Sequence, residues 1–230
     1  MSQFSHTKTL FHLPSNVVYL DGNSLGPMPL AARAHVATMM GNEWGEQMIK
    51  GWNNAGWMSL STQIGDRIAP LIGAEPGHVI MGDTLSIKVH QALAAALALN
   101  PGRKVILSDY GNFPSDLYMA QGLIKTLDRG HTLKTVAPED VSHHIDDQVA
   151  VLMLTEVDYR TGRKHDMQAL TATAHAHGVI TLWDLAHSVG ALPVDLVDSR
   201  VDFAVGCTYK YLNGGPGAPA FIYVCPGYVN

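Results

Sequence analysis

The lysine at position 210 is well suited to covalent chemistry. It lies between Tyr209 and Tyr211 in an irregular, glycine-rich segment, Cys207–Gly217. A lone lysine is usually a solvated surface charge. Apolar and aromatic neighbours, however, disfavour the charged ammonium and favour the free amine, which can attack a carbonyl carbon. The setting of Lys210 therefore predicts an amine nucleophile on a loop.

An acid and a histidine follow an apolar run elsewhere in the chain. Val179–Trp183 predicts a buried strand, and Asp184 and His187 come soon after it. Open α/β sheets bind ligands beyond the carboxyl ends of their strands, so we expect Asp184 to point into the site. The ordinary alternatives are a helix cap for the acid and a packed or surface position for the histidine.

The start of a predicted helix, Ser86–Leu99, could hold an anion. It follows a predicted strand, His78–Met81, and Thr84 and Ser86 place hydroxyls beside its free N–H groups. These groups and the helix dipole suit a phosphate, although the same hydroxyls also cap many ordinary helices. Nucleotide motifs are absent, because no GxxxxGK[ST] occurs and Gly214–Gly217 lacks the GxGxxG spacing. A phosphate-ready helix, an acid and a later lysine together match the needs of a pyridoxal phosphate site.

These residues must be positioned by alternating strands and helices. From Lys104 onward, apolar runs alternate with helical stretches, which are Val105–Ser108, Ser115–Leu127, Val149–Leu154, Met167–His177 and Val179–Trp183. Crossovers of this length predict parallel strands covered by helices on both faces. Asp202–Gly206 and Ala218–Val224 have no helical pattern between them, so we expect these two strands to be antiparallel. The expected class is α/β, a three-layer α/β/α fold around a mostly parallel, mixed sheet.

Before Lys104 the pattern is less regular. A polar leader precedes a helical run at Leu30–Glu46 and a patch rich in Trp, Gly and Asn at Trp52–Trp57. The sheet is expected to begin only after this part of the chain.

Composition limits the class of protein and its partners. The chain is 47% hydrophobic, enough for one large domain or two small ones, and its low charged fraction of 15% suggests surface that faces another subunit or domain. A formal net charge of −5 offers no attraction to nucleic acid or an anionic membrane, and neither partner is expected. The longest apolar stretch, Ala92–Leu99, is too short to span a bilayer, and the first residues lack a signal-peptide core.

Cysteines and histidines point to a reduced, metal-free protein. Cys207 and Cys225 form no CxxC pair, which argues against a disulfide scaffold or zinc module and favours the cytoplasm. His143-His144 and His175-x-His177 do not place two imidazoles on one helical face, and no HExxH occurs, so no metal site is expected.

Five stretches of the sequence together carry a family pattern, namely Tyr19–Gly26, Trp52–Trp57, Asn112–Tyr118, Trp183–Ser188 and Cys207–Gly217. In this order they resemble kynureninases, which are fold-type-I pyridoxal-phosphate enzymes of the aminotransferase class V type. The resemblance implies hydrolysis of the Cβ–Cγ bond of L-kynurenine to anthranilate and L-alanine, in tryptophan catabolism and, in some organisms, NAD biosynthesis. It leaves open a preference for 3-hydroxykynurenine.

The resemblance also assigns roles to individual residues. Lys210 resembles the lysine that bonds the cofactor and later moves the Cα proton, and Asp184 resembles the partner of the pyridine nitrogen, whose protonation favours electron withdrawal. Tyr209 resembles a phosphate contact that also shuttles a proton. The other cofactor-binding positions implied are Leu85 and Ser86 at the phosphate, Phe113, Pro114, Ser115 and Asp116 in the segment with the stacking ring, Thr155, and His187.

The family pattern extends beyond this chain. Kynureninases continue past the lysine loop into the rest of the large domain and a small domain, which supplies an arginine for the substrate carboxylate. Residues 1–60 are expected to form an N-terminal segment with a helix and loops facing substrate and dimer partner, and residues 61–230 an incomplete PLP-binding large domain. The resemblance implies a homodimer, and a chain ending at Asn230 is expected to be a truncated product or fragment.

Two alternatives remain open at this point. A relative of cysteine desulfurases or selenocysteine lyases would use the same cofactor, but it needs a mobile cysteine, and Cys207 and Cys225 lie in strand-like contexts. A truncated, non-catalytic remnant or dimer partner would keep the sheet without the activity.

Overall fold

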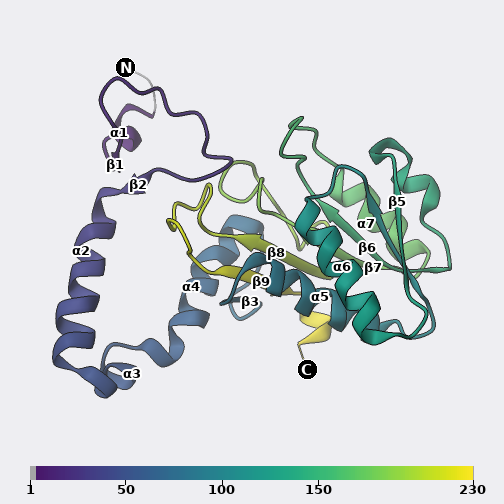
Figure 1. The fold of residues 1–230 in the computed structure, drawn as a ribbon, viewed down its shortest axis with the longest axis horizontal. Helices are drawn as coiled ribbons and strands as arrows, with labels where there is room; N and C mark the ends of the chain where they lie inside the picture. Colours follow the sequence, from purple (N-terminus) through teal and green to yellow (C-terminus); the bar gives the residue numbers. More distant parts are fainter. Residues whose placement is uncertain (1–3, 230) are drawn as a thin grey trace.

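A computed structural model describes residues 4–229 of the chain. Its main feature is a seven-stranded sheet with helices on both faces (Figure 1). The strands of this sheet are β3 (Val79–Met81), β4 (Val105–Asp109), β5 (Thr132–Val136), β6 (Val149–Thr155), β7 (Ile180–Asp184), β8 (Phe203–Cys207) and β9 (Ala220–Val224). A separate two-stranded sheet consists of β1 (Phe11–His12) and β2 (Met28–Pro29). The α-helices are α1 (Ser5–Lys8), α2 (Leu30–Thr38), α3 (Gly51–Asn54), α4 (Leu60–Ile68), α5 (Leu85–Leu99), α6 (Pro114–Leu127) and α7 (Met167–Ala176). A π-helical segment, η1, spans Met39–Glu46, and shorter 3-10 segments are η2 (Met48–Lys50), η3 (Trp57–Ser59), η4 (Ala69–Ile72), η5 (Pro138–His144) and η6 (Pro226–Tyr228).

The strand order of the sheet is β3-β9-β8-β7-β6-β4-β5. Five neighbouring strands, from β8 to β5, are parallel, whereas β9 runs antiparallel to both β8 and β3. The expected class, α/β with a mostly parallel mixed sheet, is confirmed, as is the antiparallel pairing of the last two strands. Because β3 runs in the same direction as β8, six strands end at the same edge of the sheet.

One expectation about the sheet was wrong, and one strand was missed. The sheet does not begin after Lys104, because β3, which confirms the strand predicted at His78–Met81, pairs with β9 in the register Ile80↔Ile222. β5 was not predicted, because it is an edge strand in which only Val136 is buried, so it presents no apolar run. The helical run at Leu30–Glu46 is also divided, since α2 ends at Thr38 and the chain continues as η1.

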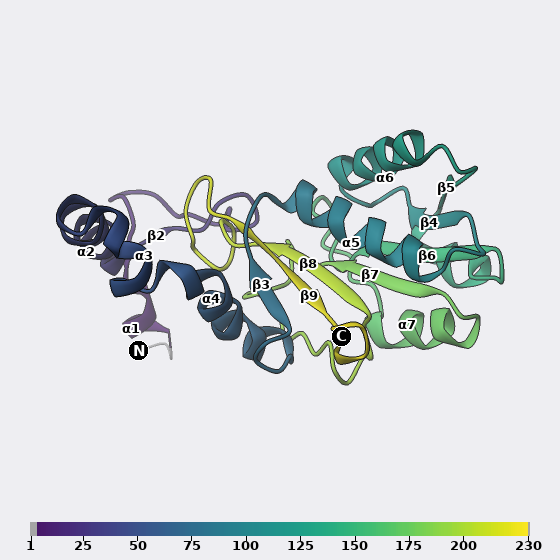
Figure 2. The same ribbon diagram turned by 90° about the horizontal axis from the view of Figure 1, so that it is seen from below.

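The core lies in two layers, one on each face of the sheet. In Figure 2, α5 and α6 lie on one side of the strands, and α4 and α7 lie on the other. The first layer includes Leu93 of α5 and Ile106 of β4, and the second includes Ile68 of α4 and Trp183 of β7. All seven residues of β6 are buried, which is why Val149–Leu154 of this central strand are apolar without a break.

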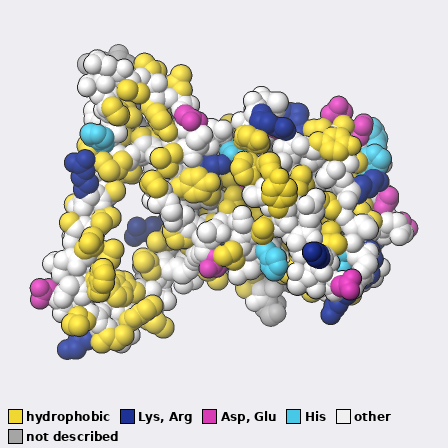
Figure 3. Space-filling model, viewed as in Figure 1, with side chains coloured by type: hydrophobic (Ala, Val, Ile, Leu, Met, Phe, Trp, Pro, Cys, Tyr) yellow, Lys and Arg dark blue, Asp and Glu magenta, His cyan; other side chains and the backbone are white. Residues whose placement is uncertain are grey.

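The segment that contains α2, η1 and α3 extends away from the sheet (Figure 1). None of the residues of α2 or η1 is buried, and large apolar side chains such as Trp44 (61% exposed) and Met40 (54% exposed) face outward. Figure 3 shows many hydrophobic side chains on this extension. Within residues 4–229, no helix has the length and hydrophobicity needed to cross a bilayer.

Replacing Gly65 by alanine should destabilise the fold. Gly65 is buried in α4, and a Cβ atom there would lie 1.9 Å from the carbonyl oxygen of Val79 in β3. Overpacking of this kind costs about 1–3 kcal/mol, which corresponds to a fall in Tm of roughly 2–12 °C. The control is Gly122→Ala on the exposed side of α6, where no atom lies within 4 Å and helix propensity favours alanine by about 0.5–1 kcal/mol. Equal thermal shifts for the two variants would contradict this account of the α4–β3 contact.

Candidate active site

A cavity of about 160 Å³ lies where the parallel strands end. Its walls come from four segments that follow β3, β4, β7 and β8, and the residues are Thr84, Leu85, Ser86, Phe113, Ser115, Asp184, Ala186, His187, Tyr209 and Lys210. The topology explains this convergence, because segments far apart in the sequence leave the sheet at one edge.

Asp184 is the last residue of β7 and is almost fully buried. Its Oδ1 accepts a hydrogen bond from the backbone N–H of Ala186 at 2.8 Å. Burial raises the pKa of Asp184 to about 6, although this N–H group and the charge of Lys210 oppose the increase. Burial and the neighbouring Asp184 carboxylate raise the pKa of Asp116 well above its ordinary value. Asp116 is therefore the acid that keeps its proton and can donate it in a hydrogen bond to Asp184.

Asn112 links this acid pair to the start of α6. Its Oδ1 accepts from the N–H of Phe113 at 2.7 Å and from the Thr155 hydroxyl at 2.6 Å. Its amide donates to Ser108 Oγ at 2.8 Å and to the Met153 carbonyl at 3.2 Å. Thr155 Oγ1 also lies 3.4 Å from Asp184 Oδ2, but a hydroxyl has one proton and the Asn112 contact is the shorter one. This buried network holds Phe113 at the cavity wall.

Lys210 and His187 are in direct contact. Lys210 Nζ donates to His187 Nε2, and both side chains are buried. Burial and the charge of Lys210 lower the pKa of His187 to about 4, so the ring is neutral at neutral pH and can accept this hydrogen bond. In the described part of the chain, the buried Nδ1 of His187 has no hydrogen-bond partner. Lys210 Nζ also lies 5.5 Å from the centre of the Phe113 ring.

The Tyr209 phenol and the Cys207 thiol near Lys210 stay protonated at neutral pH. Burial raises the pKa of Tyr209 to about 12 and that of the Cys207 thiol to about 11. Cys207 is a buried thiol within β8, and Cys225 lies just after β9 with its pKa also raised by burial. Neither cysteine has the exposed, ionised thiol that a mobile nucleophile requires.

The residues at the cavity fit pyridoxal phosphate. The N–H of Ile87 donates to the Thr84 side chain at 3.5 Å, which leaves the N–H groups of Leu85 and Ser86 and the Ser86 hydroxyl to suit the phosphate. The Asp184 carboxyl suits a protonated ring nitrogen, and the Lys210 amine suits the aldehyde. Nδ1 of His187, which has no hydrogen-bond partner among the described residues, is a further polar group that could contact the cofactor. Across the described residues, no cluster of three or more His, Cys, Asp or Glu side chains could hold a metal ion.

The aminotransferase class-V family matches residues 53–223, most of the chain. The chain belongs to this family. Aminotransferase class-V relatives include the kynureninase of Pseudomonas fluorescens, which is 52% identical over 94% of this chain and 53% of its own length. The kynureninase of Burkholderia pseudomallei strain 1106a is 54% identical over 93% of this chain and 53% of its own length. The chain thus spans about half the length of these relatives.

Solved structures share the class-V fold at low sequence identity. The C-DES mutant with glycine covalently linked to the PLP cofactor has a TM-score of 0.79 and 17% identity, and the match covers 93% of this chain and 58% of that one. The apo cysteine desulfurase of Thermococcus onnurineus NA1 has a TM-score of 0.76 and 19% identity, over 97% of this chain and 57% of that one. These matches establish the common fold.

The structure brings most of the predicted site residues together. Eight of them line the cavity, namely Leu85, Ser86, Phe113, Ser115, Asp184, His187, Tyr209 and Lys210. Asp116 and Thr155 lie behind it, against Asp184, whereas Pro114 is the first residue of α6 and does not line the cavity. Asn112 was missed as a site residue, although its place after a strand and before Phe113 and Pro114 was a usable signal.

Replacing Asp184 by asparagine should stabilise the cofactor-free protein at neutral pH. The folded-state pKa of Asp184, about 6, is above the ordinary 3.8, so the wild type loses stability as pH rises from about 4 through 6. The advantage of Asp184→Asn over the wild type should therefore grow across this range, by up to roughly 3 kcal/mol. Thermal melts at about pH 4.5 and 7.5 measure it, with the exposed Asp198→Asn as control. An advantage that does not change with pH would contradict the buried-acid interpretation.

Proposed function

We propose that this chain is the cofactor-binding part of a pyridoxal-phosphate enzyme that hydrolyses L-kynurenine to anthranilate and L-alanine. The observation that carries the proposal is the convergence of Lys210, Asp184 and the start of α5 on one cavity. Relatives named kynureninase, 52% and 54% identical to the chain, support the reaction and the small-molecule substrate. 3-Hydroxykynurenine is a second substrate to test, since it differs only by a ring hydroxyl.

The residues of the chain divide the work of binding and proton transfer. Pyridoxal phosphate, when bound, supplies an electron-withdrawing ring that makes the Cα–H bond of an amino acid acidic. Lys210 supplies the amine that bonds the cofactor and, once released, a base close to the cavity centre. Asp184 holds negative charge where a protonated ring nitrogen needs it, and Asp116 supports Asp184 by keeping its own proton. Tyr209 remains a neutral phenol and is therefore able to donate a proton.

We also propose that the extension formed by residues in α2 and η1 faces a second copy of the chain in a homodimer. Its apolar side chains, including Trp44 (61% exposed) and Met40 (54% exposed), are largely uncovered by the described part of the chain. Exposed apolar patches of this kind mark interaction surfaces. Residues 1–60 would then form the segment that faces substrate and partner, and residues 61–230 the cofactor domain. The two free cysteines suit the cytoplasm.

The lysine is the decisive residue for a test of cofactor binding. Added pyridoxal phosphate should become fixed to wild-type protein by borohydride reduction, and peptide mass spectrometry should find it on Lys210. Lys210→Ala should remove this attachment, whereas Lys104→Ala, outside the cavity, should keep it. Attachment spread over several lysines, or kept in Lys210→Ala, would refute the proposed site.

The reaction has its own test. Anthranilate fluorescence should rise when the cofactor-loaded protein receives L-kynurenine, and Tyr209→Phe should slow the release by about 10²–10⁴-fold if its phenol transfers a proton. Cofactor attachment without conversion of either kynurenine would restrict the proposal for this chain to cofactor binding.

A further inference from the structure

A hairpin next to the cavity, residues 156–165, has no role in the site described above. Val157 and Lys164 form an antiparallel bridge, and the N–H of His165 donates to the Glu156 carbonyl at 2.9 Å. The N–H of Asp158 donates to the Arg163 carbonyl at 2.9 Å and closes the turn. Residues 159–162 therefore form the tip of a defined structure, and not a loose connection between β6 and α7.

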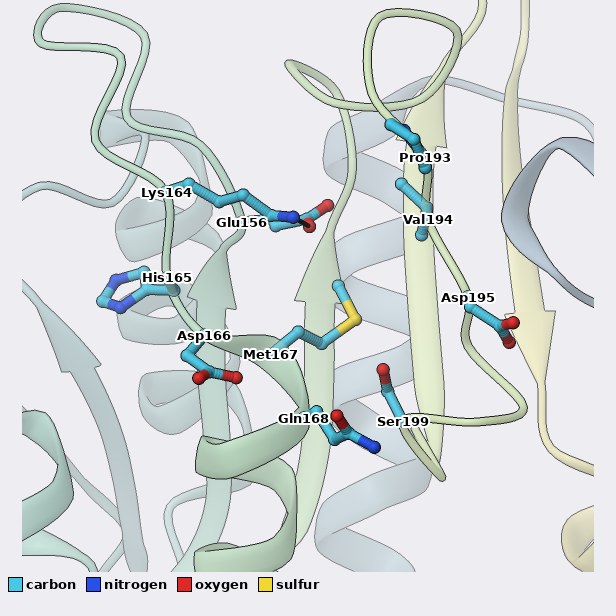
Figure 4. Close-up of a pocket in the computed structure, with 10 residues that line it drawn as sticks. All are labelled: Glu156, Lys164, His165, Asp166, Met167, Gln168, Pro193, Val194, Asp195 and Ser199. Carbon is cyan, nitrogen blue, oxygen red and sulfur yellow. Dashed lines mark ion pairs between the residues drawn. The ribbon is translucent and has the colours of Figure 1, made fainter.

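Ionic and hydrogen-bonded contacts fix the base of this hairpin on both sides. Lys164 Nζ lies 3.4 Å from Glu156 Oε1, whereas His165 Nε2 lies 2.5 Å from Asp109 Oδ2. Figure 4 shows these opposite directions, because Lys164 reaches toward Glu156 while His165 points the other way. Arg163 Nη2 adds a contact of 3.3 Å to the same Asp109 oxygen. Asp109 is the buried last residue of β4, so the sheet itself anchors the hairpin.

The tip of the hairpin places Tyr159 against two residues of the cavity wall. The Tyr159 ring centre is 5.1 Å from that of Phe113, with the planes at 67°. It is 5.9 Å from that of His187, with the planes at 29°, a stacked arrangement. The Asn23 side chain donates to the Tyr159 carbonyl at 3.3 Å, which fixes the tip from the N-terminal side. Tyr159 itself does not line the cavity, so its effect must pass through Phe113 and His187.

We propose that Tyr159 is a positioning residue, held by the Asp109–His165 contact, which sets the places of Phe113 and His187 for cofactor binding. The inference rests on the proposed function, because it concerns the same cavity. His187 contacts Lys210, so a shift of the imidazole also shifts the amine. Loss of the Tyr159 ring removes its packing against Phe113 and His187. Loss of the His165 contact removes the shortest of the side-chain contacts that join the hairpin to Asp109, so the ring is held less firmly.

The test is a double-mutant cycle on the dissociation constant of pyridoxal phosphate. Tyr159→Leu and His165→Gln should each weaken binding by about five- to tenfold, as expected for lost aromatic packing. Tyr159→Phe keeps the ring and should bind as the wild type does. The double variant should bind no more weakly than Tyr159→Leu alone, because His165 acts through Tyr159. Additive losses, or no loss in Tyr159→Leu, would overturn the proposal.

A matched control and a readout without cofactor complete the design. His175 Nε2 lies 2.8 Å from Asp202 Oδ2, and neither residue lines the cavity. His175→Gln should therefore leave the dissociation constant of pyridoxal phosphate unchanged. In the cofactor-free protein, the NMR signals of the His187 ring should move in Tyr159→Leu and His165→Gln but not in His175→Gln. If wild type bound no cofactor, the proposed function would fail, while unchanged His187 signals would separately refute the positioning role. Thermal melts of all variants report loss of folding.

Discussion

The burial of the Asp184 carboxyl at the end of β7 is the constraint on which the rest of the site depends. A buried acid is tolerated only if hydrogen bonds or an opposite charge compensate for lost solvation. Here the backbone N–H of Ala186 and the ammonium of Lys210 provide that compensation, from two different segments of the sheet edge. The retained proton on Asp116 removes the repulsion that a second carboxylate would cause. The segments that carry Ala186, Lys210 and Asp116 are thus all positioned by their interactions with the Asp184 carboxyl.

Much of the fold could be predicted because its centre is simple. β6 and β7 are buried over their full lengths, so their sequences are mostly apolar, and the crossovers between strands are long enough for helices. The edges of the sheet were harder. β5 is polar on its exposed side and was missed. β3 was predicted as a strand, but its place in the sheet was not, because it pairs with a strand much later in the sequence. The place of such an edge strand is specified by its partner, not by a local pattern.

The residues of the candidate site also fall into two groups, those with a local sequence signal and those without one. Lys210, Asp184 and the start of α5 could be found because each follows a strand or opens a helix, places where functional groups gather in α/β proteins. Tyr159 carries no such local signal, and its contacts with Phe113 and His187 exist only after three chain segments meet. Asn112 is similar, since its partners Ser108, Met153 and Thr155 lie on two strands. Residues that act through tertiary contacts require coordinates.

The pairing of β3 with β9 has a consequence for the order of assembly. Val79 lies opposite Tyr223, so β3 has no strand partner until the chain has been synthesised beyond β9. The pairing of β3 with β9 also holds the turn between β3 and α5, because the Asp83 carbonyl accepts a hydrogen bond from the N–H of Ala220. Contacts so distant in sequence form slowly, since a long loop must close first. The start of α5 is therefore expected to reach its final position after the central strands, so a nascent chain would form those strands well before this helix start could bind the phosphate of the proposed cofactor.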